Sequence, residues 1–125
     1  MNRECVFAWF NRLYRWCFPL YRLLYFLYKR FSDRDKINLI TGHVKPGMSV
    51  LDIGANIGFY TILLSRSVGK NGTVYAFEPE EDNFNHLKRL TKKLTNIKRV
   101  QAACGEKSGI AYLYKSENLN VDHHL

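Results

Sequence analysis

The sequence predicts an α/β protein built on a parallel sheet with helices on both faces. Short apolar segments alternate with amphipathic helical segments between residues 48 and 104, which is typical of strands joined by helical crossovers. The first apolar segment ends in an acid and a glycine, as a buried parallel strand does where it enters a tight turn. A chain of 125 residues, 46% hydrophobic and 24% charged, suits one globular domain and excludes a disordered tail or a fibrous repeat.

Residues 1–36 differ in composition from the rest of the chain. Residues 1–30 carry six basic side chains and one acidic side chain, so they hold +5 of the net charge of +8. Residues 1–31 contain 11 of the 18 aromatic side chains. We therefore predict a basic aromatic helical segment at 1–36, followed by an α/β domain at 37–125.

The N-terminal segment is predicted to contain two short helices, 5–18 and 19–31, with Pro19 tolerated at the start of the second. At about 100° per residue, five basic side chains project within an arc of roughly 100°, and the other sides are aromatic or leucine. This pattern fits an amphipathic helix on an anionic membrane surface, and it equally fits a cover helix that packs its rings on a globular domain. The five basic residues are Arg12, Arg15, Arg22, Lys29 and Arg30.

The predicted α/β domain starts with a helix, a strand and a second helix. Capping groups around Asp33 predict a short helix that ends before Gly42, and a Lys-Pro-Gly turn follows. Residues 48–54 form the first predicted strand. Asn56 can cap the next helix, 58–68, which ends at a Gly-Lys-Asn-Gly turn.

A second strand and a third helix of the domain follow in the same order. The strand at 73–77 ends at Glu78, because Pro79 biases the preceding residue away from helix. A helix is predicted to follow, because the acidic residues at 80–82 suit the positive end of a helix dipole. The apolar stripe of this predicted helix continues to Leu94.

The last predicted elements are a third strand at 97–104 and a hairpin strand at 110–114. Together the elements make one half of a doubly wound domain, whose ligand crevice forms where the strand order reverses. The sequence stops at Leu125, before a second half would begin. We therefore expect a fragment or a truncated form.

Cysteine spacing and hydropathy indicate the compartment. Cys5, Cys17 and Cys104 are odd in number and lack a C-x-x-C spacing, which argues against a disulfide framework and against a zinc site. No window contains the roughly 20 uncharged residues that a membrane-spanning helix needs. We expect a cytoplasmic protein without a bound metal, peripheral to a membrane if the N-terminal helices bind lipid.

The residues that carry chemistry follow the first strand, in the run Asp52-Ile53-Gly54-Ala55-Asn56-Ile57-Gly58. Glycines there allow a sharp turn and close approach of a nucleotide-like ligand. A phosphate loop would need Gly-Lys-Ser/Thr, which is absent. A dinucleotide fingerprint would need glycine where Asn56 stands, so an NAD-type oxidoreductase is disfavoured but stays open. The Asp-x-Gly-x-x-x-Gly spacing that remains resembles the turn of S-adenosylmethionine-binding proteins.

The cofactor chemistry suits these positions. Asp52 would place negative charge beside the cationic sulfonium and ammonium groups, and backbone N–H groups from Gly54 to Gly58 could take the carboxylate. Glu78 would accept the two ribose hydroxyls from the end of the second strand. An acid at that place also serves a nicotinamide nucleotide, so the combination of Asp52 and Glu78 carries more weight than Glu78 alone.

Two runs, 50–61 and 74–79, resemble the FkbM-type S-adenosylmethionine-dependent methyltransferases in their Gly-Ala-Asn-x-Gly turn and Phe-Glu-Pro ending. The resemblance covers about residues 44–115 and implies a Rossmann-like class I methyltransferase sheet, here ending after the third main strand and a hairpin strand. The later acidic motif of the family is missing, because the chain ends first. The resemblance implies cofactor contacts at Asp52, Gly54, Ala55, Asn56, Gly58 and Glu78, with Ala103 and Cys104 near the adenine.

The family resemblance implies methyl transfer to a hydroxyl of a sugar or small molecule. The catalytic base and the acceptor wall would come from the missing half, so we expect weak or absent catalysis from these 125 residues. No RNA-binding aromatic signature accompanies the basic cluster at 88–93, so no nucleic-acid partner is expected. A membrane-surface module carrying an inactive remnant of the domain is the alternative function, through residues 1–31.

Overall fold

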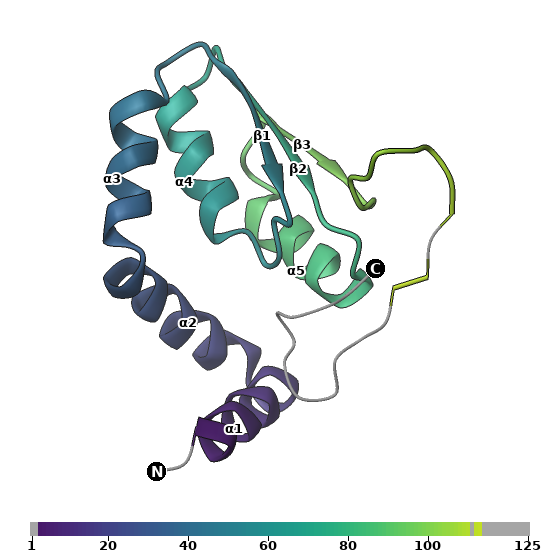
Figure 1. Ribbon diagram of the computed structural model, residues 1–125. Helices are drawn as coiled ribbons and strands as arrows, with labels where there is room; N and C mark the ends of the chain where they lie inside the picture. Colours follow the sequence, from purple (N-terminus) through teal and green to yellow (C-terminus); the bar gives the residue numbers. More distant parts are fainter. Residues whose placement is uncertain (1–2, 111, 114–125) are drawn as a thin grey trace. The chain divides into compact units, whose positions relative to one another are not determined.

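The computed structural model describes residues 3–110, 112 and 113, with the side chains of residues 3–8 and 10 excepted (Figure 1). The chain divides into two compact units, residues 1–33 with 109–125 and residues 34–108. No helix in the described part of the chain is long and apolar enough to cross a membrane.

The first unit contains the two predicted N-terminal helices, α1 (Arg3–Trp16) and α2 (Phe18–Ser32). They are separated by Cys17, and the proline lies in the first turn of α2, where the missing N–H costs little. Aromatic rings pack around Tyr21: its ring centroid lies 5.1 Å from that of Tyr14 and 5.8 Å from that of Tyr25. Tyr21 is buried, and burial raises the pKa of its hydroxyl to about 12.

The second unit is a three-stranded parallel sheet in the order β1-β2-β3, with helices in the crossovers. This arrangement confirms the predicted α/β fold class. Its strands are β1 (Ser49–Ile53), β2 (Thr73–Phe77) and β3 (Ile97–Val100). Its helices are α3 (Arg34–His43), α4 (Phe59–Val68) and α5 (Glu81–Thr91).

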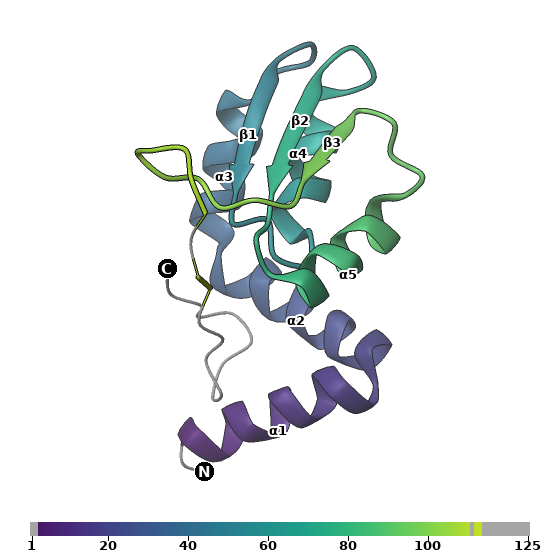
Figure 2. The ribbon, with the colours of Figure 1, turned by 90° about the vertical axis from the view of Figure 1, so that its right-hand side faces the viewer.

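One face of the sheet carries the core of the second unit. The inward residues Val74, Ala76 and Ile97 are buried against apolar side chains of α4 and α5, and α4 lies behind the strands in Figure 2. The core thus fixes the two crossover helices on the same face, as their apolar stripes require. It comprises Ala55, Leu64, Val68, Val74, Ala76, Phe84, Leu87 and Ile97.

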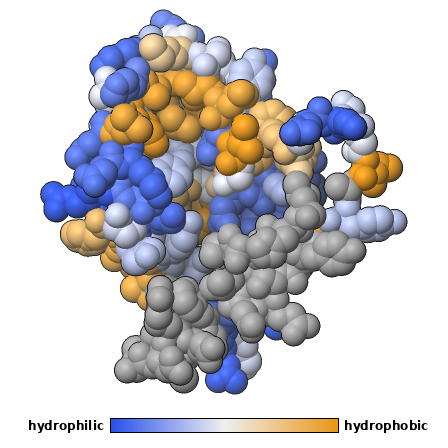
Figure 3. All heavy atoms as spheres, in the orientation of Figure 1, coloured by the Kyte–Doolittle hydropathy of each residue, from blue (hydrophilic) through white to orange (hydrophobic). Residues whose placement is uncertain are grey.

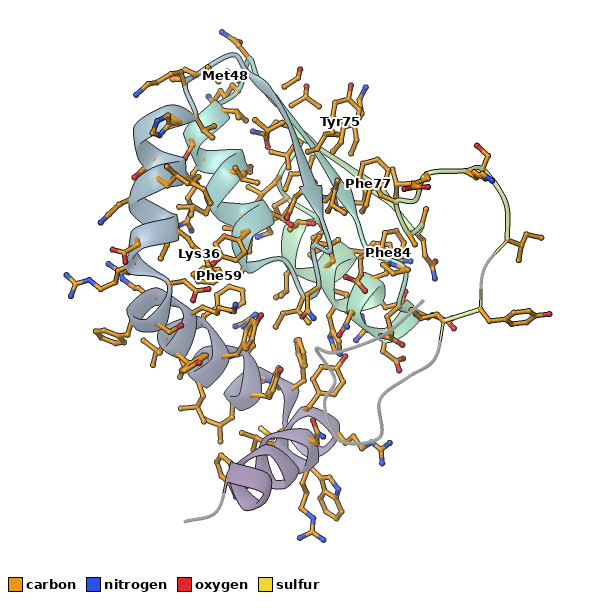
Figure 4. All side chains as sticks on the ribbon, in the orientation of Figure 1. Lys36, Met48, Phe59, Tyr75, Phe77 and Phe84 are labelled. Atoms are coloured by element: carbon orange, nitrogen blue, oxygen red, sulfur yellow. The ribbon has the colours of Figure 1, made fainter. Side chains whose placement is uncertain are left out.

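The opposite face of the sheet is open in the described residues. Leu51 and Ile53 of β1 are 64% and 62% exposed, and hydrophobic residues gather over β1 in Figure 3. Figure 4 shows Tyr75 and Phe77 on the side of the sheet away from α4. The fold class predicts helices on both faces, and the described residues supply those of one face.

Two element ends differ from the sequence prediction. β3 stops at Val100 instead of residue 104, because its neighbour β2 ends at Phe77, the residue paired with Val100.

α5 stops at Thr91, before Leu94. The Arg99 guanidinium donates to the backbone oxygens of Thr91, at the end of the helix, and of Leu94 beyond it, and the Leu94 N–H also donates to the Thr91 oxygen. Of the predicted strand at 110–114, residues 111 and 114 lie outside the described part, and the other three are not in a strand.

Candidate functional site

The sequence-predicted acids lie at the carboxyl ends of two neighbouring parallel strands. Asp52 is the penultimate residue of β1 and pairs with Ala76, and Glu78 directly follows β2. The N–H groups of Gly54 and Ala55 both donate to the Phe77 carbonyl oxygen, at 3.0 and 2.9 Å. The turn after β1 is therefore fastened to the end of β2. In open α/β sheets, ligands bind outside the carboxyl ends of the strands.

Asp52 is a buried carboxylate held by one helix residue. It is 9% exposed, and the Thr61 hydroxyl of α4 donates to its Oδ2 at 2.5 Å. Burial raises the pKa of Asp52, and the hydrogen bond from Thr61 lowers it in part. A partly desolvated acid with one fixed donor keeps its remaining lone pairs for a cationic ligand.

The turn at residues 54–58 takes a backbone path that ordinary side chains disfavour. Gly54, Asn56 and Gly58 have positive φ angles of 77°, 50° and 100°, and asparagine is among the few non-glycine residues that tolerate this region. The Asn56 Oδ1 accepts from the next N–H, that of Ile57, at 2.7 Å. Its side chain therefore stabilises the turn itself, at the position where a dinucleotide fingerprint has glycine.

The N–H groups of residues 54–58 already have acceptors within the protein. Besides the two that bond Phe77, the Asn56 N–H donates to Glu78 Oε2, the Ile57 N–H to Asn56 Oδ1, and the Gly58 N–H to the Ala55 oxygen. From the sequence, these groups could take the cofactor carboxylate, and that stays a prediction. In this structure they build the turn, because its tight path turns each N–H toward a nearby protein oxygen.

Glu78 connects three segments at the edge of the sheet. Its carboxylate accepts from the Asn56 N–H at 2.7 Å and from the Glu80 N–H at 3.0 Å, and its own N–H donates to the Val100 oxygen at 3.1 Å. The residue is 4% exposed. The carboxylate therefore ties the turn after β1 and the start of α5 to the end of β2.

Gly58 is the site residue with the closest packing. A Cβ built on it would lie 2.8 Å from the Leu87 Cδ1 of α5. A Cβ on Gly54 would meet no atom within 4 Å. The two glycines thus have different tasks: Gly58 lets α4 and α5 approach, and Gly54 leaves open space beside the turn.

Ala103 and Cys104 are not brought to a strand end. Both are exposed and lie beyond the end of β3, in a segment without regular structure. The expectation that they end the third strand is wrong, since β2 offers no partner past Phe77. Their adenine contact stays a prediction.

Two functional side chains were missed by the sequence reasoning, Thr61 and Glu80. Thr61 is fully buried on the inner side of α4, three residues before Leu64. A polar residue on an apolar helix face needs a buried partner, and this signal points to Asp52. Glu80 was expected in the first turn of α5, but it is the N-cap, and its Oε2 accepts from the Asn83 N–H at 2.8 Å.

Within residues 3–110, 112 and 113 no group of three potential metal ligands is present.

Comparisons with known proteins agree with this geometry. The family model for the methyltransferase FkbM domain matches residues 52–122, more than half of the chain. A solved structure of a SAM-dependent methyltransferase from Aquifex aeolicus is similar with a TM-score of 0.51 and 32% identity, over 60% of this chain and 40% of that one. These matches confirm the Rossmann-like fold, the methyltransferase assignment and the S-adenosylmethionine dependence of the family.

Two curated relatives act on RNA. The chain is 44% identical over 55 residues to the rRNA 2′-O-methyltransferase fibrillarin of Rattus norvegicus, covering 44% of this chain and 17% of the relative. It is 36% identical over 56 residues to the tRNA (adenine(58)-N(1))-methyltransferase catalytic subunit TRM61 of Yarrowia lipolytica, covering 43% and 14%. The chain therefore spans less than a fifth of the length of either relative.

The relatives overturn the expectation that nucleic acid plays no part. Both contain a region similar to this chain and both act on RNA. The absence of an aromatic RNA-binding signature was the wrong criterion for excluding RNA. Enzymes with unlike methyl acceptors share the similar region, so this region carries little information on the acceptor.

Proposed function

We propose, from the premise that this chain belongs to the FkbM-type methyltransferase family, that residues 37–125 carry the S-adenosylmethionine-binding half of a methyltransferase domain. The observation that carries the proposal is the hydrogen bond from the Asn56 N–H to Glu78 Oε2. It joins the turn after Asp52 to the carboxylate after β2, so two acidic groups and a tight turn lie at one edge of the sheet.

The two carboxylates suit the two polar ends of the cofactor. S-Adenosylmethionine supplies an electrophilic methyl group on a sulfonium. The lone pairs of Asp52 that Thr61 does not use can face positive charge, and the Glu78 carboxylate, at the end of the neighbouring strand, is a group of the type that accepts ribose hydroxyls. The N–H groups of residues 54–58 fit the cofactor carboxylate less well, because they have internal acceptors. Its donors are therefore expected elsewhere.

We propose a hydroxyl group as the methyl acceptor, on a sugar or small molecule or on the ribose of an RNA. Transfer to oxygen forms a C–O bond, breaks the S–C bond, and releases the hydroxyl proton to a base. Two observations favour the RNA ribose as the second candidate: the 2′-O-specific relative and the exposed basic side chains of α5 and the residues after it. These are Lys88, Arg89, Lys92 and Lys93.

Cofactor binding is tested by thermal unfolding of the chain with S-adenosylmethionine, S-adenosylhomocysteine or NAD⁺. We expect stabilisation by the first two, of about 2.7 kcal/mol at a ligand concentration 100 times the Kd. S-Adenosylhomocysteine lacks the sulfonium charge, so Asp52→Asn should weaken the binding of S-adenosylmethionine more than that of its product. Stabilisation by NAD⁺ alone would contradict the assignment.

The acceptor is tested separately by transfer of a labelled methyl group to either a structured RNA or a mixture of saccharides. A 2′-O-methylated RNA product resists alkaline hydrolysis at the modified position, which distinguishes it from base methylation. Label in the saccharides alone would favour the sugar or small-molecule acceptor. Label on RNA bases alone would rule out the proposed hydroxyl acceptor.

A further inference from the structure

The helix α2 exposes an apolar stripe that no described contact covers. Leu20, Leu23, Leu27 and Phe31 are 43%, 54%, 44% and 71% exposed. Their spacings of three, four and four residues place them within an arc of about 80° on one side of the helix. We call these four residues the α2 stripe.

The α2 stripe is distinct from the side of the helix that packs within the first unit. Tyr21 and Tyr25 stack with centroids 5.8 Å apart, and Tyr14 meets Phe18 and Tyr21 edge-on at 5.6 and 5.1 Å. At about 100° per residue, Tyr21 and Tyr25 lie roughly 100° or more from Leu27. The helix thus has one aromatic side with partners in its own unit and one aliphatic side facing solvent.

Positive charge flanks the α2 stripe. Arg30 is exposed on the flank of the stripe beside Leu23, Arg22 is exposed about 100° further round the helix than that leucine, and α2 contains no acidic residue. At about 100° per residue, Arg30 projects within about 20° of Leu23. Lys29 is engaged differently, because its Nζ lies 3.0 Å from Asp33 Oδ2. Trp16, 85% exposed, adds an amphipathic ring at the end of α1.

We propose that the α2 stripe docks on the surface of a bilayer containing anionic phospholipid. The leucines and Phe31 enter the boundary between headgroups and acyl chains, while Arg30 reaches the lipid phosphates from the helix flank and Arg22, on the polar side, adds positive charge near the anionic surface. The charge favours this occupant over a neutral protein surface. The apolar stripe favours it over RNA, which would engage the arginines and leave the leucines in water.

The test is flotation of the full 125-residue chain with vesicles of phosphatidylcholine, with or without phosphatidylglycerol. The wild-type chain is expected to float with the anionic vesicles and to do so at least tenfold less with neutral ones. Leu23→Gln with Leu27→Gln should reduce flotation at least tenfold. Arg22→Gln with Arg30→Gln should remove most of the difference between the two vesicle types.

The matched control is Leu39→Gln in α3, since that leucine is 61% exposed and lies in the other unit. It should float as the wild type does. Far-ultraviolet circular dichroism of each variant verifies that the helices are retained. If the leucine variant loses helix, Leu23→Ala with Leu27→Ala, which favours helix and still removes apolar area, replaces it.

Three outcomes would overturn the proposal. The wild-type chain could fail to float with anionic vesicles. The leucine variants could float normally while the arginine variants do not, which would indicate a surface for a polyanion such as RNA. Sedimentation could show a dimer that the leucine substitutions dissociate without any flotation of the wild type, and the stripe would then bind a second copy of the chain.

Discussion

The turn between β1 and α4 and the helix α2 use their side chains in opposite ways. In the turn, polar groups are buried and meet partners from the same unit: Asp52 with Thr61, and Glu78 with the backbone of Asn56 and Glu80. In α2, apolar side chains are exposed beside arginines. The polar groups of the turn are partnered by the chain's own atoms, whereas the α2 stripe is exposed among the described residues.

Among the substitutions in and around the turn, Glu78→Gln is expected to cause the largest loss of stability. The amide nitrogen of glutamine cannot accept from a backbone N–H, so either Asn56 or Glu80 would keep a buried donor without an acceptor. We expect a loss of about 1–3 kcal/mol in the free energy of unfolding, measured by urea denaturation followed by circular dichroism.

The control for this prediction is Glu81→Gln, because Glu81 is exposed at the first position of α5. It should cost at most a few tenths of a kcal/mol through the helix dipole. Equal effects of the two substitutions would show that Glu78 does not hold the segments together.

Gly58→Ala comes next in size. Alanine would sit at φ +100° with its Cβ 2.8 Å from Leu87 Cδ1, so we expect a loss of about 1–2 kcal/mol. Gly54→Ala shares the positive φ but has open space around the Cβ. Gly54→Ala should therefore lose less stability than Gly58→Ala. If the cofactor approaches the space beside Gly54, titration should show weaker cofactor binding in Gly54→Ala than in Gly58→Ala.

Thr61→Val is expected to cost about 1–2 kcal/mol, because the buried Asp52 would lose its hydroxyl donor. Thr61→Ser keeps the hydroxyl and should recover part of this loss. The pKa of Asp52, followed by carboxyl NMR shifts, should rise in the valine variant and stay near the wild-type value in the serine variant. A loss of stability without any change in that titration would mean that Thr61 acts through packing alone.

The raised pKa of Asp52 sets the sign of a pH dependence. The folded chain binds this proton more tightly than the unfolded chain does, so its contribution to stability is present below the unfolded value of 3.8 and is lost as pH rises through the folded value. Under the proposed function, cofactor binding has the opposite pH dependence, because the ionised carboxylate would face the sulfonium. Titrations at decreasing pH should show affinity falling by up to about tenfold per pH unit below the raised pKa.

The smallest effect is expected in α2. Leu23→Gln with Leu27→Gln should change the free energy of unfolding by no more than about 0.5 kcal/mol, since both side chains are already about half exposed. Both tryptophans, Trp9 and Trp16, lie in the first unit, so tryptophan fluorescence reports its unfolding. A large destabilisation would show that the stripe has a partner within the chain.

The sequence was sufficient for the parallel strands with their helical crossovers and for the residues of the turn. The Asp-x-Gly-x-x-x-Gly run and the Phe-Glu-Pro ending placed Asp52 and Glu78 at adjacent strand ends, because parallel crossovers bring such ends together. The partners of these acids were not predictable in the same way. Which N–H groups bond Glu78, and that β3 ends at Val100, depend on how the segments meet in space.

The methyl acceptor could not be predicted from the sequence, for a different reason. Residues 52–61 are typical of a cofactor site that enzymes with unlike acceptors share, so the turn cannot distinguish a sugar from an RNA. The exposure of the α2 stripe was also hidden, since leucines and aromatic residues alternate along both sides of that helix in the sequence. Only the packing of Tyr21 and Tyr25 separates the covered side from the open one.

The most direct test is an amide NMR titration of the chain with S-adenosylmethionine. If Asp52 and Glu78 bind the cofactor, we expect the largest shifts at the amides of Asn56 and Glu80, which donate to the Glu78 carboxylate, and at residues beside Asp52. Asp52→Asn should reduce these shifts at equal ligand concentration. Saturating shifts confined to other segments, with Asn56 and Glu80 unmoved, would contradict the proposed site.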